Sequence, residues 1–137
     1  MAISENLNGS WKHDIKTSVY NPGPTAERHL RVYESIGEGF KVTCEEIVAG
    51  REVSWSYTAE KYDGEIYPVH GRSDVDGIKS YLLNDTSTFG IFTLNGEEVG
   101  FYKRTLSSDG SILTVVESGR GDDSAPPYWN VSSFTRL

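Results

Sequence analysis

The chain has 137 residues and a formal net charge of −7, with 36% hydrophobic and 12% aromatic residues. A chain of this length predicts one domain, which would bury about two-thirds of its unfolded surface. The negative charge argues against a nucleic-acid partner and against an anionic membrane surface.

Ten strand-like runs follow one another along the chain, and no stretch has the apolar spacing of an amphipathic helix. The Pro-Gly-Pro segment at Pro22–Pro24 cannot lie in a central strand. Asp63-Gly64 and Asn95-Gly96 are hairpin signals, because both favour tight turns with positive φ. The expected strands are 11–17, 28–36, 40–48, 52–59, 66–70, 77–83, 87–94, 99–106, 112–117 and 128–135.

Most connections between these runs are short turns, and only 18–27 and 71–76 exceed hairpin length. Strands joined in this way are expected to pair with their neighbours as an antiparallel meander. A sandwich is the rival architecture, but it usually needs longer crossing connections. Closure also removes the two bare edges of an open sheet. The sequence therefore predicts a single all-β domain over residues 1–137, an up-and-down antiparallel barrel of about eight to ten strands with almost no helix.

Alternation of apolar and polar residues assigns one face of several strands to the interior. Glu46 shares the inward face of 40–48, and Glu34 falls on the same face as the apolar residues of 28–36. The later strands carry apolar residues on both faces, so the sequence does not decide which of their faces points into the barrel. The residues assigned inward are Leu30, Val32, Phe40, Val42, Cys44, Val48, Val53, Trp55, Tyr57 and Ala59.

Cys44 is the single cysteine, which excludes an internal disulfide and a multi-cysteine metal site. Its place in a strand-like run predicts a buried thiol. The three histidines have no metal-binding spacing, and the sequence predicts neither a metal nor a cofactor. The N-terminus has no leader-like segment and no apolar run reaches the ~20 residues of a membrane helix, so a cytoplasmic location is expected.

Sequence motifs at both ends of the chain suggest a family. Gly9-Ser10-Trp11 has the Gly-x-Trp form found on the first strand of lipocalins and fatty-acid-binding proteins, and Arg136 falls on the last expected strand. In calycin barrels an arginine there packs across that tryptophan and closes one end. The chain also resembles a largely uncharacterised family of small bacterial lipocalin-like domains in Leu7–Lys12, Pro22–Pro24, Tyr33-Glu34, Trp55–Tyr57, Tyr62–Gly64 and Tyr67–Val69. The resemblance implies the barrel fold and a closed end at Trp11 and Arg136, and it implies no activity.

Two residues are candidates for acid–base catalysis. His70 ends a strand, and histidine is the side-chain type best suited to acid–base work near neutral pH. An inward Glu46 would need either an ion-pair partner or a raised pKa. Lys103 and Arg104 are candidate partners, and alternation sends only one of them inward. A solvent-exposed histidine and a structural ion pair are the alternative interpretations.

Large side chains predict a lined interior, because tyrosine and tryptophan combine an apolar body with one hydrogen-bonding group. The leading hypothesis is binding of a small, mostly apolar or aromatic ligand. The alternatives are a cofactor-independent isomerase, cyclase or lyase, and a filled barrel that serves as an interaction domain, with a homodimer left open. A carboxylate or histidine within reach of a tyrosine would favour catalysis. The candidate ligand-binding residues are Val42, Cys44, Trp55, Tyr57, Tyr81, Phe89, Phe101, Tyr102 and Trp129.

Overall fold

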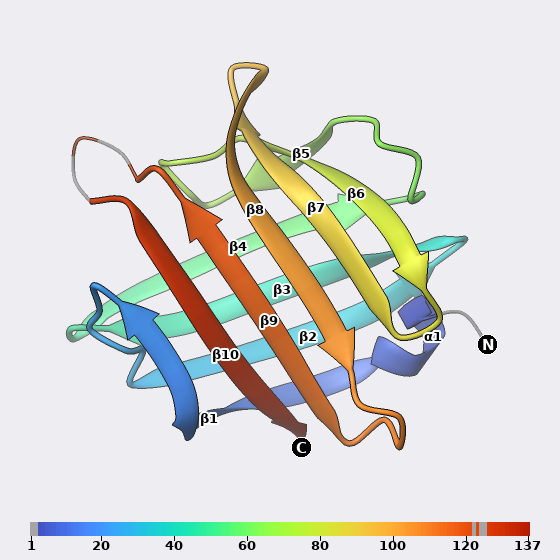
Figure 1. The fold of residues 1–137 in the computed structure, drawn as a ribbon, viewed down its shortest axis with the longest axis horizontal. Helices are drawn as coiled ribbons and strands as arrows, with labels where there is room; N and C mark the ends of the chain where they lie inside the picture. Colours follow the sequence, from blue (N-terminus) through green and yellow to red (C-terminus); the bar gives the residue numbers. More distant parts are fainter. Residues whose placement is uncertain (1–2, 122, 124–125) are drawn as a thin grey trace.

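Ten antiparallel strands close into a barrel in the computed structural model, which describes residues 3–121, 123 and 126–137 (Figure 1). Each strand pairs with its neighbours in sequence, and β1 pairs with β10 to complete the ring, so the predicted up-and-down barrel is confirmed. A short helix, α1 (Ile3–Leu7), precedes the strands. The strands are β1 (Gly9–Asn21), β2 (Arg28–Ile36), β3 (Gly39–Val48), β4 (Arg51–Ala59), β5 (Tyr67–His70), β6 (Gly77–Asn84), β7 (Ser87–Leu94), β8 (Glu97–Leu106), β9 (Ile112–Gly119) and β10 (Tyr128–Arg136).

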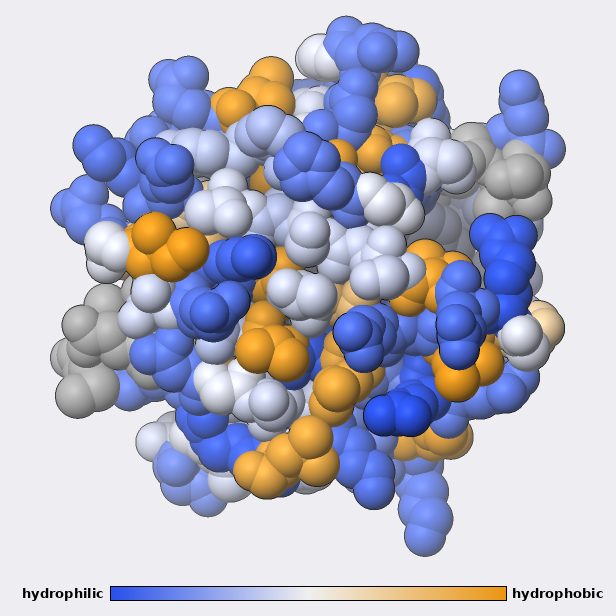
Figure 2. Space-filling view, turned by 180° about the vertical axis from the view of Figure 1, so that it is seen from behind, coloured by the Kyte–Doolittle hydropathy of each residue, from blue (hydrophilic) through white to orange (hydrophobic). Residues whose placement is uncertain are grey.

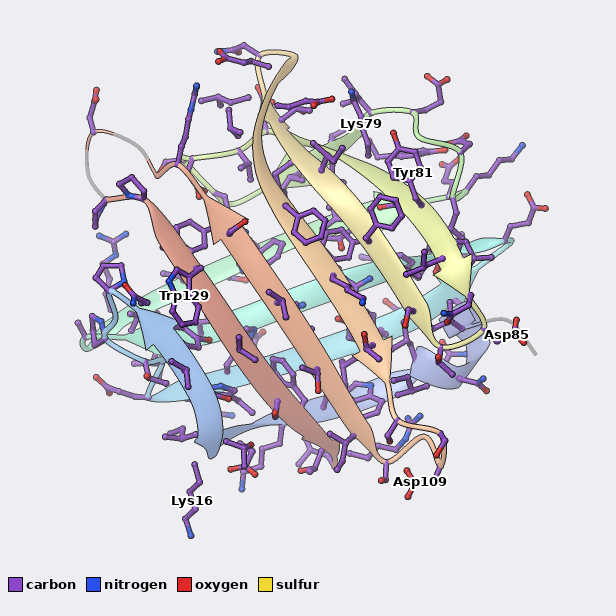
Figure 3. All side chains as sticks on the ribbon, viewed as in Figure 1. Lys16, Lys79, Tyr81, Asp85, Asp109 and Trp129 are labelled. Atoms are coloured by element: carbon purple, nitrogen blue, oxygen red, sulfur yellow. The ribbon has the colours of Figure 1, made fainter. Side chains whose placement is uncertain are left out.

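β1 bends part-way along its length. Its first residues, Gly9–Lys12, pair with β2, and its register against β10 shifts between Asp14 and Val19. After this irregularity, Val19–Asn21 pair with β10. Figure 1 shows the strand curving upward beside β10, and Lys16, labelled in Figure 3, projects outward from the bend. The bend brings the end of β1 to the end of the barrel opposite α1.

The end of the barrel near α1 is closed by Trp11 and Arg136. Trp11 is 0% exposed, and its indole N–H donates to the Leu7 carbonyl at the end of α1 over 2.9 Å. The Arg136 guanidinium lies 4.2 Å from the centre of the Trp11 ring and donates to the carbonyls of Asn8 and Gly110. The predicted packing of these two residues is confirmed. Alternation did not reveal α1, because five residues are too few to show a helical period.

The inward face of β2 is the opposite of the predicted one. Arg31 pairs with Cys44 on β3 and Tyr33 pairs with Val42, and both β3 residues are fully buried. Residues directly opposite on antiparallel strands point to the same side of the sheet. The inward set of β2 is therefore His29, Arg31 and Tyr33.

Three predicted orientations on β2 are wrong for this reason. Leu30 and Val32 face outward and are partly exposed, and Glu34 is exposed. For β3 and β4, by contrast, the inward assignments of Val42, Cys44 and the other buried residues are confirmed. The buried residues among them are Phe40, Val42, Cys44, Trp55, Tyr57 and Ala59.

The outer face of β6–β10 carries aromatic side chains. Tyr81 stacks on Phe89 with ring centres 5.0 Å apart, and Phe89 lies 6.5 Å from Phe101. Phe101 is 39% exposed and Trp129 is 46% exposed, and Tyr81 and Trp129 are labelled on their strands in Figure 3. Seen from behind, the surface shows hydrophobic residues scattered among hydrophilic ones (Figure 2). Within the described residues, no helix is long and apolar enough to span a membrane.

Candidate functional site

A cavity of about 550 Å³ opens at the barrel end opposite α1. The Pro22–Pro24 loop, the β3–β4 turn and the β5–β6 loop surround its mouth. Gly71 in the last of these loops has φ of +91°, and a Cβ there would lie 2.2 Å from the Ser54 carbonyl oxygen. Glycine is therefore required for the loop to pass so close to β4. The inner wall is formed mainly by Tyr20, His29, Arg31, Glu46, Trp55, Val115, Glu117, Tyr128 and Ser132.

The protonation of His29 follows from its neighbours. Arg31 Nε donates to His29 Nε2 over 3.1 Å, and a guanidinium has only donors, so Nε2 is the unprotonated nitrogen. The proton on Nδ1 then points to Glu46 Oε1 at 3.3 Å and to the Tyr20 hydroxyl at 3.5 Å. Burial, followed by the charge of Arg31 and the proximity of His13, holds the pKa of His29 well below its usual value. His29 is therefore a neutral link between Arg31 and Glu46.

Glu46 holds its carboxylate at the cavity wall. Trp55 Nε1 donates to Glu46 Oε2 over 3.1 Å, while His29 approaches the other oxygen. Burial raises the pKa of Glu46, although the bond from Trp55 and the charge of Arg31 oppose the rise. A carboxyl group with a raised pKa exchanges a proton closer to neutrality than an exposed one.

A second cluster lies near the mouth and is centred on Arg72. Its Nη2 lies 2.8 Å from Asp74 Oδ2 and 3.2 Å from Glu117 Oε2, and it donates to the Tyr128 hydroxyl over 2.8 Å. The guanidinium also lies 4.7 Å from the centre of the Trp55 ring. Tyr128 donates to Glu117, and burial followed by the charge of Glu117 raises the pKa of Tyr128. Arg72 therefore joins the β5–β6 loop to β9 and β10.

Beneath the cavity, the barrel interior is polar as well as aromatic. Arg104 is 1% exposed, and its three nitrogens donate to the hydroxyls of Tyr33, Tyr57 and Thr88 over 2.9, 2.8 and 3.3 Å. Arg31 Nη1 donates to the same Tyr33 hydroxyl over 3.2 Å. One phenol therefore bridges two buried guanidinium groups.

His13 is buried beside this network, and neither ring nitrogen has a hydrogen-bond partner in the part of the chain that the structure describes. Its ring centre lies 5.4 Å from that of Phe134 and 5.7 Å from that of His29. Burial, and then the charge of Arg31, lower the pKa of His13. The folded protein therefore holds a neutral imidazole with both nitrogens unsatisfied.

Replacing His13 by phenylalanine is expected to stabilise the protein by about 1 kcal/mol at pH 7.5, because it removes an unsatisfied buried polar group. Below pH about 6.5 the unfolded chain protonates the His13 side chain, whereas burial keeps it neutral in the folded chain, so this residue makes wild-type stability fall as the pH falls. The advantage of His13→Phe should therefore grow at pH 5.5. Urea unfolding at both values measures it, with exposed His70→Phe as the control. An advantage that is absent, or that shrinks at pH 5.5, would contradict a neutral, unsatisfied His13 in the folded protein.

The structure distributes the predicted site residues over three places. Glu46 and Trp55 line the cavity. Val42, Cys44, Tyr57 and Tyr102 are buried within the barrel and outside the cavity lining, and burial raises the pKa of the Cys44 thiol to about 12. The outer face carries four of the predicted ligand-binding residues, Tyr81, Phe89, Phe101 and Trp129. His70 is exposed on β5 and does not belong to the cavity lining. The ligand-binding and catalytic roles remain predictions, and position supports them for Glu46 and Trp55.

Several residues of the cavity wall were not predicted from the sequence. The main ones are Tyr20, His29, Arg31 and Arg72. For β2 a signal existed, because the polar set His29, Arg31 and Tyr33 alternates as regularly as the apolar set beside it. Arg72 lies in a loop, where alternation carries no information.

Among the described residues, no group of three or more histidine, cysteine, aspartate or glutamate side chains is placed to hold a metal ion. No protein-family model and no curated protein matches this sequence.

Proposed function

We propose that the protein binds a small organic molecule inside the barrel. The observation that carries this proposal is the cavity of about 550 Å³. Its volume falls in the size range of small-ligand sites, and its mouth lies between loops at one end of the barrel. Trp55 and Val115 offer apolar contact, while Tyr20, Tyr128 and Ser132 offer hydroxyl groups. A ligand with an aromatic or apolar body and a few polar atoms fits this wall.

The shape of the barrel supports the same proposal. The packing of Arg136 on Trp11 closes one end, as the resemblance to calycin barrels implies, and leaves the cavity at the other. We infer that the chain is a barrel of the calycin type on this ground. The lining is more charged than a purely apolar carrier would need, because Arg31, Arg72 and Glu46 all face the space.

The proposal is tested by placing a larger side chain in the cavity and measuring the binding of the uncharged probe N-phenyl-1-naphthylamine by calorimetry. Ser132 lines the cavity, whereas its neighbour Ser133 alternates to the other face of β10. Ser132→Phe is expected to weaken probe binding at least about tenfold, because the new ring occupies space that the ligand needs. Ser133→Phe, the matched control, should leave binding unchanged. Equal binding by the two variants would count against an internal site.

An acid–base enzyme is the second candidate function, and one observation favours it. His29 approaches both the Tyr20 hydroxyl and the Glu46 carboxylate, and Tyr128 meets Glu117, all on the cavity wall. Glu46 would accept a proton from a bound substrate, with His29 holding the carboxylate in place. If the wild-type protein is an acid–base enzyme, a bound substrate should incorporate deuterium from the solvent. Glu46→Gln should abolish this incorporation without weakening substrate affinity, and that result would distinguish catalysis from simple binding.

A further inference from the structure

We propose that the ligand is an organic anion, a molecule with an apolar ring body and one carboxylate or sulfonate group, and that Arg31 binds the acidic group. This inference rests on the proposed function and names the ligand class for the same cavity. It follows from the way charge is distributed over the cavity wall and the layer beneath it.

Arg31 is a buried cation on the cavity wall with neutral hydrogen-bond partners. It is 4% exposed, and within residues 3–121, 123 and 126–137 no carboxylate lies within 4.0 Å of its guanidinium. Its donors reach His29 Nε2 and the Tyr33 hydroxyl, and Nη2 has no hydrogen-bond partner among the described residues. A buried charge is costly unless an opposite charge accompanies it, so an anion in the cavity would relieve that cost.

Arg104 strengthens the positive potential at the inner end of the cavity. Its three nitrogens are satisfied by hydroxyl groups, and no described carboxylate lies within 4.0 Å of it either. The Tyr33 hydroxyl accepts from both Arg31 and Arg104, which fixes the two cations near each other. A single anion on Arg31 would therefore offset the repulsion between two guanidinium groups.

The carboxylates of the wall are already engaged elsewhere. Asp74 and Glu117 both pair with Arg72 near the mouth, and Glu46 accepts bonds from His29 and Trp55. The acidic groups thus have their own partners, while the two inner guanidinium groups have none of opposite charge among the described residues. The overall charge of −7 does not prevent anion binding, because surface charges are screened over about 8 Å at physiological ionic strength.

The geometry also fixes the orientation of the ligand. The Arg31 guanidinium lies 5.1 Å from the centre of the Phe134 ring and 5.7 Å from that of Trp55, so aromatic faces hold it before any ligand arrives. The acidic group would enter first and reach Arg31, while the apolar body would lie against Trp55 and Val115. Polar atoms at the other end of the ligand would meet Arg72 and Tyr128 at the mouth.

The experiment compares two probes that share a ring system. 8-Anilino-1-naphthalenesulfonate carries a negative charge, and N-phenyl-1-naphthylamine is its uncharged counterpart. The wild-type protein is expected to bind the sulfonate about tenfold more tightly, because one charge-assisted hydrogen bond contributes about that factor. Calorimetry gives both affinities, and quenching of Trp55 emission, absent in Trp55→Phe, reports that each probe lies inside the barrel.

Arg31→Met should remove the preference for the sulfonate, so that the two probes bind this variant with similar affinities. Arg31→Gln keeps hydrogen-bond donors without the charge and should lose the preference for the sulfonate in the same way. This variant provides the test if Arg31→Met does not fold. Arg120→Met is the matched control, because it removes one exposed positive charge outside the cavity lining and should keep the preference. Circular dichroism confirms that each variant is folded.

The outcomes separate this inference from the proposed function. Equal affinities of the two probes in the wild type, or a preference that survives in a folded Arg31 variant, would overturn the anion inference while cavity binding stands. Failure of both probes to bind, or binding without an effect on Trp55, would overturn the proposed function as well.

Discussion

Replacing Arg104 by alanine is expected to destabilise the folded protein by about 4 kcal/mol, from the cavity it creates and the hydrogen bonds it removes. The guanidinium lies 5.0, 4.8 and 4.6 Å from the ring centres of Tyr33, Phe40 and Tyr102, so its loss leaves a gap between three aromatic rings. It also removes the Arg104 donor from three hydroxyl groups, and only that of Tyr33 keeps another guanidinium donor, Arg31. A loss of this size is a large fraction of the stability of a small domain.

Urea unfolding measures this effect, with two comparison variants. Arg104→Met fills most of the space without burying a charge, so its cost should be smaller, about 1–2 kcal/mol. Lys103→Ala removes a cation from the neighbouring, outward position and should change stability by less than about 0.5 kcal/mol. If Arg104→Ala and Lys103→Ala unfold at the same urea concentration, Arg104 does not organise the interior in the way described.

Trp11→Ala is expected to cost a similar amount, about 4 kcal/mol, because a fully buried indole is removed from the closed end of the barrel. The substitution also removes the bond from the indole N–H to Leu7 and the surface on which Arg136 stacks. Both α1 and the end of β10 are therefore expected to detach from the barrel. Hydrogen exchange should show faster exchange at these two elements than elsewhere.

Trp129→Ala provides the matched control for Trp11→Ala, because it removes the same side chain from the outer face of β10. Trp129 is 46% exposed, so its loss should cost less than about 1 kcal/mol. Thermal unfolding of the two variants compares them directly. A larger loss in Trp129→Ala than in Trp11→Ala would mean that the closed end contributes little to stability.

The barrel itself could be predicted from sequence because turns and alternation are local signals. Asn95-Gly96 joins one strand to the next, and Asn95 does take a positive φ of 53°. The packing of Arg136 on Trp11 could be anticipated from the resemblance at the two chain ends. These features depend on neighbours in sequence or on a short motif, and neither requires knowledge of what fills the interior.

The inner wall of the cavity was harder to predict, because a barrel interior is not always the more apolar face. On β2 the apolar residues Leu30 and Val32 point outward, while His29, Arg31 and Tyr33 form the polar network inside. The pairing with neighbouring strands, such as Arg31 opposite Cys44, settles which face is inward.

A related difficulty affected the later strands. Phe101 and Trp129 are large aromatic residues that lie outside, whereas Arg104 lies inside. Hydrophobicity ranks these residues in the reverse order, so no scale of burial propensity would have separated them. The buried position of Arg104 is explained by the hydrogen-bond acceptors that Tyr33 and Tyr57 place in the interior.

The most direct test of an internal ligand site is a crystal structure of the protein with bound 8-anilino-1-naphthalenesulfonate. An anion site inside the barrel requires the naphthalene ring to lie against Trp55, with a sulfonate oxygen within about 3 Å of the Arg31 guanidinium. Electron density for the probe only on the outer aromatic face, beside Phe101 and Trp129, would contradict such a site.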